Sequence, residues 1–210
     1  MKERQSRPLS NKFKRVGASS AELKFKDTNK ASTAITAAGT IFNDTLVGLQ
    51  EGNTDSSRIG NRITVKSVMV RGIAQLAAAV DSANTSQSVR IIVYLDRQAN
   101  GATAAVTDIL ASADFLAFNN LDNSDRFRTL ADTIIDMQVP GATPSGAAYT
   151  FGEFNQTFFL KAKLNLDFKY KGNAGTVADL SGNNIGVLVI GKTDALGTVA
   201  YDARVRYTDQ

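Results

Sequence analysis

The feature that most constrains the fold is an alternation of apolar and polar residues in TFFLKAKLNLDFKYK, residues 157–171. Every second side chain from Phe158 to Tyr170 is apolar, and from Lys161 onward the side chains between them are Lys, Asn or Asp. A repeat of two residues is the period of a β-strand with one buried face. The segment is longer than an ordinary strand, so the pattern is also compatible with two strands that bend near Leu164–Asp167.

The same period, or a continuous apolar run, recurs along the chain. The segment 62–76 alternates and then shifts register near Ser67–Val68, which predicts a β-bulge. The apolar runs 88–96 and 184–192 indicate strands that are covered on both faces. The remaining strand-like segments are 35–50, 126–136 and 199–209. With turn-rich loops between them, these segments predict an all-β fold of roughly eight strands, a sandwich or a jelly roll.

One segment, AAVTDILASADFLAF at 104–118, has a helical pattern instead. Its apolar residues Val106, Ile109, Leu110 and Ala113 recur at intervals of three and four. Ser112 is a candidate cap for a second short helical turn. We therefore expect one or two short helices within the all-β fold.

The chain contains no His and no Cys, which removes whole classes of chemistry. Serine–histidine and cysteine–histidine catalysis, histidine–zinc sites and disulfides are all excluded. We expect a protein that is not an enzyme and needs no cofactor, and a carboxylate-dependent hydrolase on a β scaffold is the weakest alternative. No apolar run reaches the roughly 18–20 residues that span a bilayer, so no membrane partner is expected. The charged N-terminus does not resemble a secretion signal, which favours a protein made and used inside a cell.

The octapeptide GVLVIGKT, residues 186–193, matches the phosphate-binding loop pattern of nucleotide-binding proteins letter for letter. Its four variable positions are Val187, Leu188, Val189 and Ile190, side chains that favour the interior of a strand. No helical pattern follows Thr193, so no helix N-terminus would face a phosphate. We interpret the octapeptide as a buried strand followed by a turn.

Charge is distributed unevenly along the sequence. Residues 1–30 contain nine Lys or Arg and three acids, whereas residues 31–210 contain fifteen and seventeen. The basic residues of the first fifteen positions are Lys2, Arg4, Arg7, Lys12, Lys14 and Arg15. Such a segment buries too little apolar surface to offset its ordering entropy, so we expect residues 1–20 to be disordered when alone. It predicts an arm that neutralises nucleic-acid phosphates without reading sequence; a solvated tail and a nuclear-import signal are the alternatives.

Taken in order, several segments resemble single jelly-roll viral coat proteins. The matching features are the turn Arg58–Gly60, the strand end Asp96–Arg97, the pair Asn100–Gly101 and the terminal Tyr207–Asp209. They resemble the coat proteins of small circular single-stranded DNA viruses, the geminivirus and circovirus kinds. They are also similar to the satellite tobacco necrosis virus coat protein, which comes from an RNA satellite.

The resemblance implies an eight-stranded viral jelly roll over residues 21–210 that self-assembles into an icosahedral shell of about 60 copies. It implies that the arm faces a packaged single-stranded genome, with DNA favoured and RNA as the alternative. It places the protein in the virion, assembled inside the host cell, with the nucleus as one candidate location. It also implies structural calcium between subunits, with Asp209 as a candidate ligand. The outward lysines of 157–171 either face the genome or form a solvated sheet surface.

A function of another class remains open at this stage. A non-viral jelly-roll binding module, for example for carbohydrate, would carry the basic tail incidentally. Such a module would expose aromatic side chains in its loops, where Tyr149 and Phe151 are the candidates. It would be a monomer or a small oligomer, so particle size distinguishes it from a shell protein.

Overall fold

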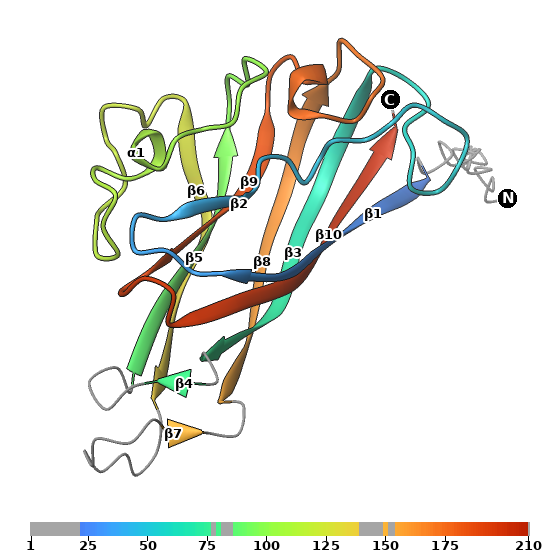
Figure 1. Ribbon diagram of the computed structural model, residues 1–210. Helices are drawn as coiled ribbons and strands as arrows, with labels where there is room; N and C mark the ends of the chain where they lie inside the picture. Colours follow the sequence, from blue (N-terminus) through green and yellow to red (C-terminus); the bar gives the residue numbers. More distant parts are fainter. Residues whose placement is uncertain (1–21, 77–78, 81–85, 139–148, 151–153, 210) are drawn as a thin grey trace, which may run out of the picture.

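The computed structural model describes residues 22–76, 79–80, 86–138, 149–150 and 154–209. Within them, eight strands form two antiparallel four-stranded sheets (Figure 1). The first sheet has the order β1 (Leu23–Ala34), β10 (Gly197–Asp209), β3 (Arg62–Leu76) and β8 (Asn155–Lys169). The second has the order β2 (Thr40–Asn43), β9 (Asn184–Gly191), β5 (Ser86–Asp96) and β6 (Phe127–Gln138). A short pair, β4 (Ala79–Val80) and β7 (Tyr149–Thr150), completes the strands.

The connections between the eight strands identify the topology. Along the chain, β5 and β6 are consecutive neighbours in one sheet, and each of the other connections passes from one sheet to the other. Two interlocked four-stranded sheets connected in this way form a jelly roll. The expected all-β jelly roll is therefore confirmed. No helix in the described part of the chain is long and apolar enough to cross a bilayer.

The main core lies between the two sheets and is built from the inward side chains that the alternation predicted. On β10, Val199, Tyr201 and Val205 are buried, whereas Asp202 and Arg206 between them are exposed. All eight residues of β9 are buried, which confirms a strand covered on both faces. Its second cover is the 97–126 connection, whose Ile109 and Leu110 pack with β5 and β9 in a second apolar cluster.

The irregularities of the two longest strands match the sequence analysis in part. The register of β3 against both of its neighbours shifts between Val65 and Ser67, so the predicted bulge is present and centred on Lys66. The β8 segment is one continuous strand with an irregularity at this same point of its pairing with β3, not two separate strands. A bulge lets paired strands bend while most of the hydrogen bonds between them are kept. The bend explains how β8 can remain one strand over fifteen residues.

Three expectations about local structure are confirmed only in part. The helix predicted over 104–118 is limited to α1, Val106–Ile109, because Leu110 forms an antiparallel bridge with Asn119 that turns the chain back on itself. The pattern in 35–50 gives a strand of four residues, β2, and the buried Leu46, Val47 and Leu49 follow it in a loop. A second short helix is the 3-10 turn Val177–Asp179, in a different place from the one expected.

The glycines of the GVLVIGKT octapeptide have a packing role. A Cβ atom at Gly186 would lie 2.3 Å from the hydroxyl oxygen of Tyr94, and one at Gly191 would lie 2.4 Å from Cγ2 of Ile35. Both distances are far inside van der Waals contact, so the two positions require glycine. Because residues 184–191 form strand β9, the backbone there does not curl around a phosphate, as the sequence analysis predicted.

Candidate nucleic-acid interface

Positive charge is concentrated on one of the two sheets. Strands β1, β10, β3 and β8 contain eleven Lys or Arg and four acids, and the strands of the second sheet contain two and three. The basic residues of the first sheet are Lys24, Lys26, Lys30, Arg62, Lys66, Arg71, Lys161, Lys163, Lys169, Arg204 and Arg206. Lys24, Lys26 and Lys30 point inward, and the other eight give the outer side of this sheet an excess of positive charge.

Strand register arranges several of these side chains into rows on the outer face of the first sheet. In an antiparallel sheet, residues directly opposite each other point to the same face. The rows across β10, β3 and β8 are Arg206–Ser67–Lys163, Arg204–Met69–Lys161 and Asp202–Arg71–Phe159. We call this set of nine residues the basic face. Its rows are two residues apart along each strand, or about 6.6 Å.

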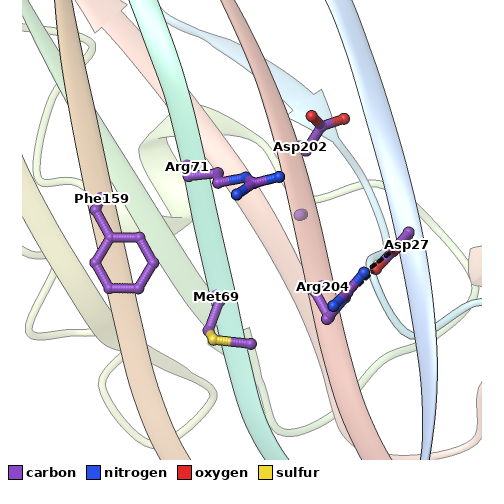
Figure 2. A pocket seen from close by; sticks show the side chains of 7 residues that line it. Asp27, Met69, Arg71, Phe159, Asp202 and Arg204 are labelled. Atoms are coloured by element: carbon purple, nitrogen blue, oxygen red, sulfur yellow. Dashed lines mark hydrogen bonds and ion pairs between the residues drawn. The ribbon is translucent and has the colours of Figure 1, made fainter.

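A hollow of about 320 Å³ opens on the basic face and extends to β1 (Figure 2). The apolar residues that line it are Phe159, which is 61% exposed, the half-buried Met69 and the buried Ala203. Figure 2 shows Phe159 on β8 at one side of the hollow and the Asp27–Arg204 pair at the other, with Arg71 between them. An exposed aromatic ring among cations is an unusual combination for a surface that contacts only water.

The acid of the basic face, Asp202, and the acid at the edge of the hollow, Asp27, already have partners. The Asp27 carboxylate accepts two hydrogen bonds from the Arg204 guanidinium, each 2.6 Å long. Those bonds lower the pKa of the Asp27 carboxyl and raise that of Arg204. Asp202 accepts a 2.9 Å hydrogen bond from the Asn29 amide. The remaining cations, Arg71, Lys161, Lys163 and Arg206, form no ion pair with another described residue, so their charge is available to a ligand.

A second polar cluster lies where the end of β10 meets the start of β1. The buried ammonium Nζ of Lys24 is 2.9 Å from the Oδ2 atom of Asp209 and 3.2 Å from the carbonyl oxygen of Ser57, to which it donates. The hydroxyl of Tyr207 donates to the same carbonyl at 3.0 Å, and the N–H of Ile59 lies 3.5 Å from Asp209 Oδ1. Within one subunit, the Lys24 ammonium therefore occupies the carboxylate and carbonyl oxygens that a calcium ion bound at Asp209 would need as ligands.

Only some of the residues that the sequence analysis predicted for function lie in the described part of the structure. The arm residues Lys2, Arg4, Arg7, Lys12, Lys14 and Arg15 lie outside the described residues, as do the side chains of Tyr149 and Phe151. The lysines of 157–171 are exposed, as expected. Among the described residues, no three acids lie close enough together to hold a metal ion, and Asp209 pairs with Lys24.

The basic face as a unit was missed by the sequence analysis. The outward positions of Arg204, Arg206 and Lys163 followed from the alternation, but their adjacency depends on which strands pair and in which register. Neither is encoded in the period of a single strand. The signal that was available is the excess of Lys and Arg over acids in the outward positions of 62–76 and 157–171.

Comparison with known proteins gives a family match over the full length. Residues 1–210 match the family model described as satellite tobacco necrosis virus coat protein. No curated protein sequence is significantly similar to the chain. Among solved structures, a chain from Desmodium yellow mottle tymovirus aligns with 100% of this chain and 88% of its own length, at 9% identity and a TM-score of 0.38.

Proposed function

The chain belongs to the satellite tobacco necrosis virus coat protein family, and from that premise we propose that its copies assemble into a small icosahedral shell of about 60 subunits around single-stranded nucleic acid. Membership in this family confirms the expected viral coat protein, a structural component of the virion. The observation that carries the proposal is the match over all 210 residues. The eight-stranded jelly roll is compatible with it, since this architecture occurs in viral capsid proteins as well as in lectins and cupins.

We propose that residues 1–20 form the arm that contacts the packaged genome. The support is compositional: the first thirty residues have a net charge of +6, from nine Lys or Arg and three acids, whereas the rest of the chain has slightly more acids than Lys and Arg. Repeated over about 60 subunits, the arms supply on the order of several hundred positive charges against phosphate. Contacts of this kind carry no sequence information, so packaging needs no base-reading site in the arm.

The family assignment changes the nucleic acid that we expect as the packaged genome. The preference for DNA rested on the resemblance to circular single-stranded DNA viruses, and the family match supports the other part of that resemblance, satellite tobacco necrosis virus. We therefore propose single-stranded RNA as the packaged genome, assembled with the shell inside the host cell. Digestion of extracted cargo with ribonuclease or deoxyribonuclease distinguishes the two.

Size-exclusion chromatography with light scattering and absorbance detection tests the function directly. The full-length protein, expressed alone, should elute as a megadalton particle with excess absorbance at nucleic-acid wavelengths. A nucleic-acid-free peak near the 22.4 kDa monomer mass, unchanged by salt or added calcium, would overturn the proposal. That result would favour the binding-module alternative instead.

Calcium at Asp209 stays a prediction, and the Lys24 ion pair makes it testable. Calcium would have to displace the Lys24 ammonium or take ligands from a second subunit. If Asp209 is a ligand, Asp209→Asn should abolish calcium binding by assembled protein in isothermal titration calorimetry. Lys24→Met should strengthen it by at least about tenfold, because it removes a competing charge at contact distance. Identical titrations for both variants and the parent would exclude Asp209 from calcium binding.

A further inference from the structure

We propose that the basic face binds single-stranded nucleic acid independently of the arm, and that the hollow beside Phe159 holds one unpaired base. The inference rests on the proposed function, since it assigns a second contact to the same genome. It also differs from the arm's contact in kind. The arm offers charge alone, whereas the basic face offers charge beside an exposed aromatic ring.

The cations of the basic face are placed to follow a phosphate backbone. Lys161 and Lys163 lie on one face of β8 about 6.6 Å apart along the strand. Arg206 is in the same row as Lys163, with the Ser67 hydroxyl between them on β3. Since these three cations form no ion pair within the described residues, phosphates can bind without breaking one. A charged groove beside a stacking surface is the usual arrangement for single-strand binding without strict sequence preference.

The hollow has the properties of a site for a base. Phe159 is directly opposite Arg71 in the β3–β8 ladder, so an aromatic surface and a planar guanidinium lie side by side. Both kinds of group stack on nucleobases. The carboxylate of Asp202, in the same row, can accept a hydrogen bond from an exocyclic amino group, since Asn29 occupies only its Oδ1 atom. The volume of about 320 Å³ is at the lower end of the range for small-ligand sites.

A second copy of the chain is the competing occupant, and charge argues against it. Two copies that meet symmetrically through this face would bring like charges together, which opposes association. In any other arrangement the second copy would have to bring carboxylates to Arg71, Lys161 and Lys163. Another surface suits contact between copies better. Leu116, Phe118 and Leu121, each more than 70% exposed, lie on the 97–126 connection that covers the second sheet, whereas the basic face belongs to the first sheet.

The test uses the full chain with the six basic arm residues replaced by serine, so that the arm contributes no charge. Binding of a short fluorescent poly(U) strand is followed by anisotropy. We expect measurable binding, weakened about five- to 150-fold by Phe159→Ser, the range for removing one base–aromatic stack. Phe118→Ser, which changes a still more exposed phenylalanine outside the basic face, should have no effect. Lys161→Gln with Lys163→Gln should weaken binding as well.

Inorganic polyphosphate, which has phosphates but no bases, separates the two parts of the proposal. Phe159→Ser should leave polyphosphate binding unchanged, and the double lysine variant should weaken it. Equal poly(U) affinity for Phe159→Ser and Phe118→Ser would overturn the base site. Absence of poly(U) binding by the arm-neutral protein would overturn the whole inference and leave the arm proposal intact. Failure of Phe159→Ser to form particles, with unchanged poly(U) affinity, would assign the face to contact between copies.

Ultraviolet cross-linking of parent particles keeps the inference testable if the arm-neutral chain does not fold. Mass spectrometry of the digested particles should find nucleotide adducts on the peptide that contains Phe159. Adducts confined to peptides from residues 1–20 would overturn the inference while supporting packaging by the arm. Particles without nucleic acid would overturn both.

Discussion

Deletion of residues 1–15 is expected to yield a shell that assembles without nuclease-protected nucleic acid. The deletion removes six of the nine basic residues in the first thirty positions and one acid, and it leaves every described strand intact. When binding depends on phosphate neutralisation, log K falls linearly as log salt concentration rises. The slope of that line is proportional to the number of phosphates that the protein neutralises. Because six cations are removed, the slope of log K against log salt for a single strand should become less negative by about 4.

The measurement is the absorbance ratio of particles purified at physiological salt, after nuclease treatment, for the deletion and the parent. A matched control keeps the length of the arm and replaces the six basic residues by serine. If charge is the cause, both variants lose their cargo to the same extent. Truncated particles that retain protected nucleic acid would remove the arm from its assigned role. Retention at low salt alone would instead fit the weaker contact that we assign to the basic face.

The sequence predicts the strands whose inward side chains are apolar. In β8, β10 and β3 the alternation identifies the element, the buried face and, near Ser67, the bulge. It does not identify β1, because the inward side chains of that strand are Lys24, Lys26, Thr28 and Lys30. These lysines direct their ammonium groups to carbonyl oxygens, a carboxylate or the ring of Phe42 at the margin of the core. A strand that satisfies its inner face with polar contacts leaves no hydrophobic period to detect.

The limited length of α1 and the basic face were unpredictable for a different reason, which is that they depend on contacts between distant segments. In 104–118 the spacing of Ile109 and Leu110 fits a longer helix, but α1 ends at Ile109 and Leu110 forms the bridge with Asn119, while both side chains pack against β5 and β9. Tertiary packing overrides a local preference of this size. The arm, by contrast, is a property of composition, so it is visible in the sequence without any knowledge of the fold.

The turn Arg58–Gly60, which contributed to the resemblance to viral coat proteins, contains the most enclosed cation of the described residues. Arg58 is 1% exposed, and its guanidinium lies 4.4 Å from the ring centroid of Tyr170. Its donors reach the carbonyl oxygens of Leu49 at 3.2 Å and Gly172 at 2.6 Å, and also that of Gly60. The side chain therefore connects the loop before β3 with the loop after β8.

Replacement of Arg58 is expected to cause the largest loss of stability of any single substitution considered for this chain. In Arg58→Met three carbonyl groups lose their charged donor inside the protein, and each unsatisfied buried acceptor costs about 1–3 kcal/mol, so we expect a total loss of about 3–5 kcal/mol. That is a large share of the roughly 5–15 kcal/mol that stabilises a domain. Arg58→Lys should recover little of it, because one ammonium cannot reproduce donors that point to separate loops.

The matched control is Arg62→Met, which removes an exposed arginine four residues from Arg58. Comparing the two variants shows how much of the stability loss comes from the burial of Arg58. Arg62 pairs with Asp167, but the side chains are 47% and 38% exposed, so its loss should cost less than about 1 kcal/mol. Guanidinium unfolding of dissociated subunits, followed by tyrosine fluorescence because the chain has no Trp, measures both. Similar midpoints for the two variants would mean that Arg58 contributes no more than a surface charge. A much lower midpoint for Arg58→Met alone would show that the shell domain depends on a cation that joins two of its loops, at a turn that also contributes to the family resemblance.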